Sequence, residues 1–425
     1  MKLARVLFFI LLVASTVLSA CQPAASNPRG NISFMISGDP AELTAYHKLV
    51  DAFSAKFPDI KVEVIEVSSS DYSKRLSADL AAGAPADVFF LNYRRQAKYS
   101  DSGVLQPLTD YLKNSKVIQE SDFYSQAMDP FKWKGEQMCI PQNISSLVVY
   151  YNKDLFNAAG VDYPAAGWTW DDFTATALAL TKDLDGDGAT DQFGLGLEPE
   201  FIRLAPFIWQ SGGELVDDPS NPATLMIDTD AGYEAFNFFV GLQTVHHVVP
   251  NAEEEKSEDS ESRFINGRTA MYFQSRRPTP TFRESANFDW DVAALPQGKS
   301  PATILHGDGY CMPSASKNKD AAWTFIEFAN SVEGQTIVAS TGRTVPSLMA
   351  VANSPAFLDP NNKPASSQVF LDVIPTMRAL PLIPAWTDIE EIVTEELTRA
   401  FYGETPVYDA IFRAIERSNE YLKPK

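Results

Sequence analysis

Strand-like and helix-like segments alternate regularly between residues 31 and 100. Short apolar or alternating segments predict strands at 31–36, 60–67 and 86–92. After each of them, apolar residues at helical spacing predict helices at 41–57, 71–82 and 94–100. Because a β-α-β-α-β order lets helices cover the faces of a parallel sheet, the chain is expected to adopt an α/β fold.

The rest of the chain continues with strands and helices in a less regular order. Further strands are predicted at 147–152, 270–274, 289–296 and 308–313. Further helices are predicted at 153–159, 170–182, 231–245, 318–330, 388–402 and 405–422. With 425 residues, of which 45% are apolar, the chain is large enough for two or three domains or one bilobal unit.

The first 20 residues have the layout of a bacterial secretory signal peptide. Lys2 and Arg5 precede an apolar stretch, Val6 to Ala20, that is too short for a helix to cross a bilayer. The sequence Leu18-Ser19-Ala20-Cys21 resembles a lipobox. The resemblance implies that Cys21 carries a lipid, that residues 21–30 form a flexible tether, and that the chain is anchored to the outer face of the cell membrane or its periplasmic side. The alternative is a short uncleaved anchor with a chance cysteine.

The chain is strongly acidic, with a formal net charge of −20. A surface of this sign repels phosphate backbones and anionic headgroups, which argues against nucleic acid or an anionic membrane surface as a partner. Solubility outside the cell is the simplest explanation of the charge.

Two further cysteines, Cys139 and Cys311, lie in similar settings, Met-Cys-Ile-Pro and Tyr-Cys-Met-Pro. Outside the cytoplasm such a pair can form a disulfide. Two separate buried thiols are the alternative.

Several stretches together carry a resemblance to one family. They are ISGDPAELTAYHKLVDAFSAKFPDIKVEV, APADVFFLNYRRQAKYSDSGVLQPLTDYL, LVVYYNKDLFNAAGV, GWTWDDF, IWQSGGELVDD, FINGRTAMYFQSRR, DWDVAALPQGKSPAT, SASKNKDAAWTFIEFANS and the tail around PAW. In this order the chain resembles the extracellular solute-binding proteins of the maltose/oligosaccharide type, which are the receptors of sugar-importing ABC transporters. The pair YNKDLF and WTWDDF is its most specific part.

The resemblance implies a periplasmic-binding-protein-like fold, in which two α/β lobes are joined by crossing hinge strands. The expected N-terminal lobe comprises 31–139 and 297–335, and the expected C-terminal lobe comprises 146–293 and 340–425. The chain would cross near 140–146, return near 293–297 and cross again near 333–345. The lobes would close on a ligand by a hinge motion, and the permease subunits would recognise the closed form.

A sugar site needs flat aromatic surfaces for the C–H faces and polar side chains for the hydroxyls. Such sites favour domain interfaces and the carboxyl ends of strands. With the resemblance, this gives the expected contacts of the N-terminal lobe and crossings: Ser37, Gly38, Asp39, Glu42, Asn92, Tyr93, Arg94, Asn143, Ser145, Asp308, Tyr310 and Arg343. The expected contacts of the C-terminal lobe are Trp209, Arg276, Arg277 and Trp386. Asp39 has a structural alternative as the cap of helix 41–57.

Two places depart from the family pattern. Arg276 and Arg277 follow the strand 270–274, where many relatives carry a tryptophan. Two arginines there could bond hydroxyls or meet an acidic ligand such as a uronate. At the first crossing some sugar binders carry a carboxylate where this chain has Asn143 and Ser145, which argues against a maltodextrin.

Residues 183–191, DLDGDGATD, resemble the first half of an EF-hand loop, with Asp183, Asp185, Asp187 and Asp191 at ligand positions. Gly194 stands where a bidentate glutamate is needed. The segment is therefore either a structural calcium site or a solvated Asp-Gly turn, and no other cofactor is expected.

No motif in the chain predicts catalysis. Its four histidines lie outside any metal or nucleophile motif, and acidic residues are too numerous for carboxylate pairs to indicate an enzyme. The favoured function is capture of a mono- or oligosaccharide between the lobes and its delivery to an ABC permease. The alternatives are a lipoprotein that binds an acidic, phosphorylated or uronate ligand and, less favoured, a secreted glycan-processing enzyme.

Overall fold

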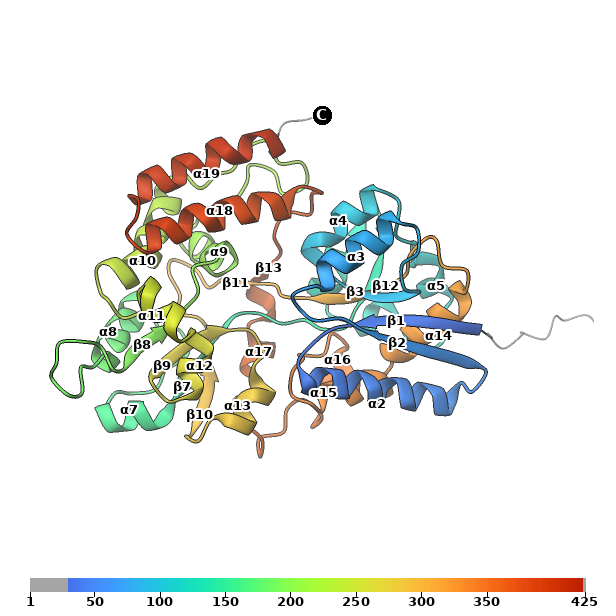
Figure 1. Cartoon of the computed structure of the whole chain (residues 1–425), viewed down its shortest axis with the longest axis horizontal. Helices are drawn as coiled ribbons and strands as arrows, with labels where there is room; N and C mark the ends of the chain where they lie inside the picture. Colours follow the sequence, from blue (N-terminus) through green and yellow to red (C-terminus); the bar gives the residue numbers. More distant parts are fainter. Residues whose placement is uncertain (1–29, 423–425) are drawn as a thin grey trace, which may run out of the picture.

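The computed structural model describes residues 30–422 of the chain. The expected signal peptide, Cys21 and most of the tether lie outside the described residues. The described chain forms two bodies, here called the N-lobe and the C-lobe, with extended segments between them (Figure 1). No helix among the described residues combines the length and the apolar character that crossing a membrane requires.

The N-lobe is built on a five-stranded sheet in the order β2-β1-β3-β12-β6. Its strands are β1 (Gly30–Ile36), β2 (Ile60–Glu66), β3 (Val88–Asn92), β6 (Cys139–Pro141) and β12 (Asp308–Cys311). Its main helices are α2 (Pro40–Lys56), α3 (Tyr72–Ala81), α4 (Tyr93–Asp101), α14 (Lys319–Ala329), α15 (Val332–Ala339) and α16 (Met349–Ala352). β1 pairs in parallel with β2 and β3, whereas β12 runs antiparallel to β3 and β6. Phe34 and Phe53 contact Phe325 in the core between sheet and helices.

Shorter elements complete the N-lobe. They are α5 (Thr109–Asn114), α6 (Ser125–Met128), β4 (Lys132–Trp133) and β5 (Glu136–Gln137).

The C-lobe has a four-stranded sheet in the order β10-β7-β9-β8. Its strands are β7 (Val148–Asn152), β8 (Phe193–Gly196), β9 (Thr269–Gln274) and β10 (Trp290–Ala293). Its helices are α7 (Lys153–Ala159), α8 (Trp170–Leu180), α9 (Phe201–Gln210), α10 (Asp230–Thr244), α11 (Ala252–Ser257), α12 (Ser260–Ile265), α13 (Thr279–Ser285), α18 (Trp386–Phe401) and α19 (Val407–Leu422). The rings of Phe173 and Phe207 stack on Phe273 of β9 and fix α8 and α9 to the sheet. Both lobes thus confirm the predicted α/β fold.

Three chain segments lie side by side between the lobes. Asn143 pairs with Pro346, and Ser145 pairs with His306, each as an antiparallel bridge. Beside them, β11 (Thr303–Ile304) pairs in parallel with β13 (Met377–Arg378). The first crossing therefore includes residues 143–145, and the chain returns to the N-lobe at 304–308.

This arrangement corrects the expected return near 293–297. Trp290–Ala293 is a strand of the C-lobe sheet, and Gln297 still pairs with Thr169 of that lobe. The C-lobe also does not resume at residue 340, because the apolar side chains of Leu348 and Val351 are buried in the N-lobe core. The chain rejoins the C-lobe later, where Ser366 bonds Asp291 just before α17 (Val369–Asp372).

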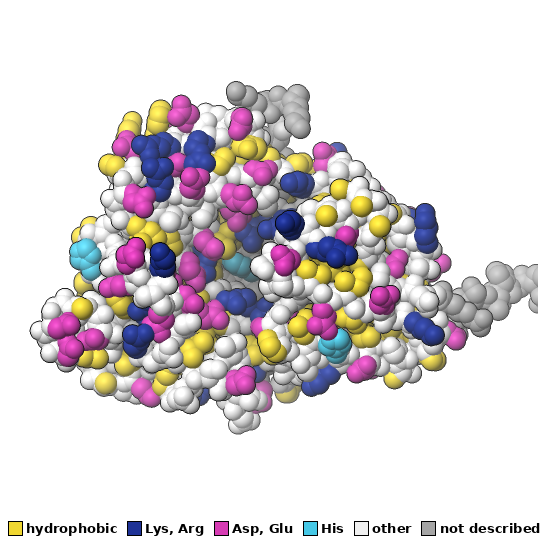
Figure 2. Space-filling view, viewed as in Figure 1, with side chains coloured by type: hydrophobic (Ala, Val, Ile, Leu, Met, Phe, Trp, Pro, Cys, Tyr) yellow, Lys and Arg dark blue, Asp and Glu magenta, His cyan; other side chains and the backbone are white. Residues whose placement is uncertain are grey.

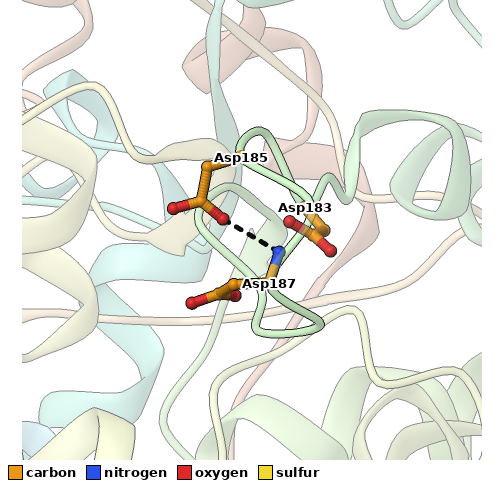
Figure 3. A group of neighbouring side chains, drawn as sticks. All are labelled: Asp183, Asp185 and Asp187. Atoms are coloured by element: carbon orange, nitrogen blue, oxygen red, sulfur yellow. Dashed lines mark hydrogen bonds between the residues drawn. The ribbon is translucent and has the colours of Figure 1, made fainter.

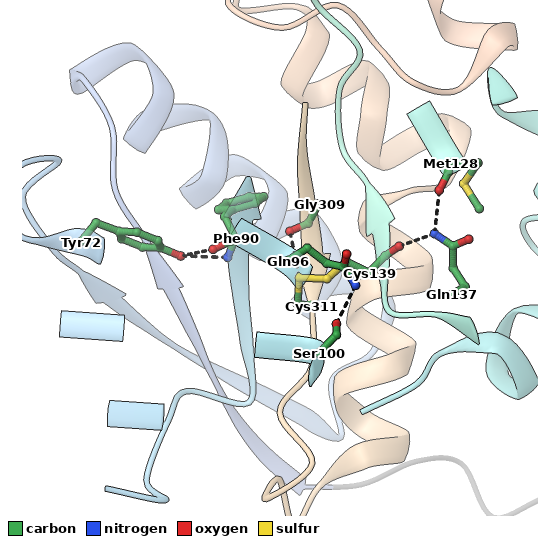
Figure 4. Close-up of a disulfide and its surroundings, with 9 residues drawn as sticks. All are labelled: Tyr72, Phe90, Gln96, Ser100, Met128, Gln137, Cys139, Gly309 and Cys311. Carbon is green, nitrogen blue, oxygen red and sulfur yellow. Dashed lines mark hydrogen bonds between the residues drawn. A yellow bond between two sulfur atoms is a disulfide. The ribbon is translucent and has the colours of Figure 1, made fainter. Parts of the chain in front are cut away.

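Cys139 of β6 and Cys311 of β12 stand opposite each other in neighbouring strands of the N-lobe sheet (Figure 4). Their sulfurs are joined in a disulfide, with 4.4 Å between the Cα atoms, rather than left as two separate thiols. Gln137 donates a hydrogen bond of 2.7 Å to the carbonyl of Cys139. The disulfide therefore ties together the N-lobe ends of the first crossing and of the return.

Candidate functional site

A polar cavity of about 480 Å³ lies beside the crossing segments. It adjoins a smaller cavity of about 170 Å³, and the two share the lining residues Glu42, Asn92, Arg277, Asp308 and Arg343. We call the combined space the interlobe cleft, because its walls come from both lobes. Figure 2 shows a hollow at this place, with charged side chains of both signs along its walls.

The turn after β1 forms one wall of the cleft through Ser37, Gly38 and Asp39. Asp39 caps α2, since its Oδ1 accepts a hydrogen bond of 2.9 Å from the backbone N–H of Glu42. Its other carboxylate oxygen lies 2.5 Å from Nη1 of Arg343. Asp39 therefore caps α2 as the structural alternative expects and also lines the cleft, while its contact with a ligand stays a prediction.

Arg343 holds a second carboxylate of the same wall. Its Nη2 lies 2.6 Å from Oε2 of Glu42, and the hydroxyl of Tyr46 donates to Oε1 of Glu42 over 2.8 Å. Burial raises the pKa of Glu42 above its ordinary value, and the neighbouring Arg343 opposes that rise. The cluster is a hydrogen-bonded, charge-balanced group in the cleft wall.

The junction of β3 and α4 forms a second wall, through Asn92 at the end of the strand and Arg94 in the first turn of the helix. Asn92 caps α4 with its Oδ1, which also accepts from Nε of Arg94, and its Nδ2 donates to Asp308 over 3.1 Å. Arg94 in turn forms an ion pair with Glu390 of α18, in the other lobe. Burial raises the pKa of Glu390, while Arg94 lowers it. A direct contact between the lobes therefore starts at a residue of the cleft wall.

The crossing segments supply the base of the cleft. Oδ1 of Asn143 accepts from the backbone N–H of Asp308 over 3.3 Å, and Gln142 donates to the Tyr46 hydroxyl over 3.1 Å. Ser145 and His306 also line the smaller cavity. Burial, with a smaller effect of Arg94, lowers the pKa of His306 to about 3, so its ring is neutral at physiological pH.

The C-lobe contributes Ser275 and Arg277, which follow β9. Arg277 forms an ion pair with Glu261 of α12. Each of Arg94, Arg277 and Arg343 thus faces a carboxylate. These three arginines therefore offer donors with their charge compensated, whereas the cleft residue Arg95 has no ion-pair partner among residues 30–422.

The structure does not bring every predicted contact to the cleft. The rings of Tyr93 and Tyr310 are fully buried, with the Tyr93 hydroxyl accepting from the backbone of Leu380. Arg276 is also buried, because its side chain turns away from the cleft into the hinge region. The burial follows from packing across the lobes, which no local sequence pattern reveals.

The two predicted tryptophans also lie outside the cleft. Trp386 is completely buried in the C-lobe core, next to Phe201. Trp209 is 4% exposed, and the guanidinium of Arg378 lies 4.8 Å from its ring centre. Neither ring is available for stacking on a sugar in this structure.

Other cleft residues were not predicted from the sequence. They are Tyr46, Ser69, Tyr72, Ser73, Leu76, Phe90, Leu91, Arg95, Tyr99, Gln142, Ser275, His306 and Thr344. Gln142, Ser275 and Thr344 adjoin predicted contacts in the chain, and that adjacency was the available signal. The residues of α3 gave none, because a helix flank reaches the cleft only through the tertiary fold.

The acidic turn, residues 183–191, lies between α8 and β8 and is separate from the cleft. Carboxylate oxygens of Asp183, Asp185 and Asp187 come within 4.8 Å of one another, and all three residues are exposed (Figure 3). They also accept hydrogen bonds from the turn's own backbone, as from Gly186 and Gly188 to Asp183. Asp191 instead accepts from the backbone of Leu184. Calcium binding at this turn stays a prediction.

The chain was compared with known proteins. A family model described as bacterial extracellular solute-binding protein matches residues 37–336. A substrate-binding protein of an ABC transporter from Listeria monocytogenes, solved with cycloalternan, is 26% identical and superposes with a TM-score of 0.86, over 93% of this chain and all of that one. The sn-glycerol-3-phosphate-binding periplasmic protein of Escherichia coli K12 is 25% identical over 404 residues, 88% of either chain.

A binding protein of Brucella abortus strain 2308 is 25% identical over 414 residues, 96% of this chain and 97% of that one. The similarity to these relatives extends over both lobes. The family match covers well over half of the chain and includes the first turn, the first crossing, the return near 304–308 and most of the cleft residues, but not the segment around Arg343. The chain belongs to the bacterial extracellular solute-binding protein family.

Proposed function

We propose that the chain is the receptor of an ABC importer and that it captures a carbohydrate in the interlobe cleft. The observation that carries this proposal is the balance of charge in the cleft, where Arg94, Arg277 and Arg343 each face a carboxylate. Sugar hydroxyls both donate and accept hydrogen bonds, so they match a wall of alternating guanidinium, amide and carboxylate groups. The similarity to the Listeria protein solved with cycloalternan supports a carbohydrate.

In this mechanism the solute binds to the N-lobe wall and the C-lobe closes over it. Closure would turn on the crossing segments around Asn143, His306 and Pro346, which are extended and paired with one another. The ion pair between Arg94 and Glu390, which is present in this structure, would help to hold the lobes together. The closed form would then dock on the permease, while a lipid at Cys21 would hold the receptor at the membrane.

An acidic or phosphorylated solute is the second candidate. Arg95 lines the cleft beside the hydroxyl of Ser73, and no carboxylate forms an ion pair with it among residues 30–422. The E. coli relative is named for sn-glycerol-3-phosphate, which supports an anionic ligand. This candidate needs an uncompensated cation, and the exposed Arg95 is the cleft arginine that meets that need.

A thermal-shift screen of the mature protein tests both candidates. The panel contains neutral mono- and oligosaccharides, uronic acids and glycerol phosphates. A solute that binds only the folded chain raises the melting temperature. The carbohydrate proposal predicts a shift by a neutral sugar that is insensitive to salt, whereas an anionic ligand loses affinity as salt screens its charge. A panel in which no sugar shifts the melting temperature would remove the carbohydrate proposal.

A further inference from the structure

Arg276 is a buried cation without a carboxylate partner in the described part of the chain. Its side chain is 1% exposed, and burial lowers its pKa to about 9. An unpaired charge in a protein interior is costly unless several hydrogen bonds satisfy it. The contacts of this guanidinium therefore indicate what it does.

The guanidinium joins segments that are far apart in the sequence. Its Nε donates to the carbonyl of Gly342 over 2.7 Å, and its Nη1 donates to Oγ of Ser367 over 3.0 Å. The group also lies against the rings of Phe357 and Phe370, at 4.8 and 5.0 Å from their centres. Arg276 thus links the end of β9 to two segments, one before and one after the last passage of the chain from the N-lobe to the C-lobe.

The link between 276–277 and 342–343 runs in both directions. The side chain of Arg276 bonds the backbone of Gly342, and the side chain of Arg343 donates to the carbonyl of Arg277 over 3.3 Å. The backbone N–H of Arg276 also donates to Oγ of Ser145 in the first crossing. Arg277 and Arg343 line the cleft. Each of these two arginines is therefore the chain neighbour of one partner of the buried hydrogen bond between Arg276 and Gly342.

We propose that Arg276 is a positioning residue of the interlobe cleft. It fixes the segment that carries Arg277 against the segment that carries Arg343, and so sets the distance between two cleft guanidiniums that belong to different walls. The proposal rests on the proposed function for its ligand, but the positioning itself is a property of the chain without ligand.

Gly342 is suited to this link. Its backbone has a φ of +83°, which side-chain-bearing residues rarely adopt, and a Cβ atom there would lie 2.1 Å from Nη1 of Arg283. Arg283 itself donates to the carbonyl of Lys363 over 2.6 Å and makes no bond to Gly342 in the structure. Arg283 therefore provides a comparison variant, as a partly buried arginine that packs against Gly342 but hydrogen-bonds only the later segment.

Hydrogen exchange of the full mature chain without ligand tests the positioning. Arg276→Met keeps an apolar stem against the two phenyl rings and removes the donors. We expect exchange at 340–346 and 143–147 to rise about threefold to tenfold, as the loss of one or two net hydrogen bonds allows. Arg276→Lys keeps the charge but loses the planar, widely spaced donors of the guanidinium, so exchange should rise by less in this variant. Arg283→Met removes a packing contact with Gly342 but no hydrogen bond to it, so exchange should rise mainly at 363–367 and less at 340–346 than in Arg276→Met.

Parent-like exchange at 340–346 in Arg276→Met would overturn the proposal, and so would an increase of equal size throughout both lobes. If that variant does not fold, Ser367→Ala decides, because it removes one acceptor and leaves the guanidinium in place. A local rise at 340–346 in Ser367→Ala supports the proposal, and its absence overturns it.

A second readout uses cycloalternan and sn-glycerol 3-phosphate as probes. Where either one raises the melting temperature of the parent, Arg276→Met should lower that probe's affinity more than Arg283→Met does at a similar loss of melting temperature. Equal affinity loss in the two variants would overturn the positioning role. If neither these probes nor the wider panel shifts the parent, the proposed function fails, while the exchange experiment still decides the role of Arg276.

Discussion

Nη1 of Arg343 lies 2.5 Å from Oδ2 of Asp39, although the two residues are 304 positions apart in the sequence. The pair joins the turn after the first strand to a segment that lies beside the first crossing. Because Arg343 also donates to the backbone of Arg277, one side chain connects the cleft walls of both lobes. The geometry of the cleft thus depends on a few arginines at the hinge.

Removal of the Arg343 side chain should destabilise the protein. Arg343→Met leaves the carboxylates of Asp39 and Glu42 without their cation, and breaking a largely buried pair in this way costs about 2–4 kcal/mol. Urea unfolding measures the loss. Adding Glu42→Gln to the variant should restore part of the stability, since one uncompensated charge is removed, and a double variant less stable than the single one would contradict this account.

The disulfide should contribute to stability even though it lies within one sheet. Cys139→Ala with Cys311→Ala removes a link across 172 residues, which typically costs about 2–4 kcal/mol. The unfolding midpoint in denaturant, measured with and without reductant, checks this. The parent should lose stability with reductant and the double variant should not respond to it. A parent midpoint that does not change when reductant is present under unfolding conditions would argue against the disulfide bond.

The partly buried His306 should make the folded state sensitive to mild acid. Its pKa is about 3 in the folded chain, against an ordinary value near 6.5, so below pH 6.5 the unfolded chain binds a proton that the folded chain does not. Stability should therefore fall as pH drops from about 6.5 towards 3, by roughly 1–2 kcal/mol between pH 7 and pH 5. His306→Gln should reduce that loss. The comparison requires melting curves of both proteins, and parallel pH profiles would show that His306 does not titrate as described.

Trp386 should act through stability rather than through ligand stacking. Its ring is fully buried, so Trp386→Ala should cost about 3–5 kcal/mol. Trp386→Phe fills most of the space and should leave solute affinity close to that of the parent. Calorimetry with the best solute of the panel provides the measurement. A large loss of affinity in the Phe variant, at an unchanged melting temperature, would indicate that Trp386 contacts the ligand after all.

Local patterns were enough to predict the strands and helices of the first α/β unit. The spacing of Leu43, Tyr46, Val50 and Phe53 predicted α2, and Pro58 predicted its end. The return crossing was misplaced because the segment around Gln297 has no signal that assigns it to either lobe. Its assignment comes from a backbone pairing with Thr169, which is a contact distant in sequence.

The cleft was predicted only in part, because the sequence identifies strand ends but not contacts between distant segments. Asp39 lies shortly after the strand β1 and Asn92 ends the strand β3, so the carboxyl ends of those apolar strands identified them. Arg276 and Arg277 could not be told apart from the sequence, yet one is buried in the hinge and the other lines the cleft. Which of two neighbouring side chains faces a cavity is decided by the tertiary packing around the strand end.

The most direct test of the account is calorimetric titration of the best panel solute into the parent and into Arg277→Met. Arg277 lines both parts of the cleft and is nearly half exposed, so its replacement should barely change stability. The account predicts a stoichiometry of one solute per chain and an affinity at least about tenfold weaker in the variant, as the loss of a charged hydrogen bond implies. Equal affinities for the parent, for Arg277→Met and for Asp308→Asn at the same cleft would contradict it.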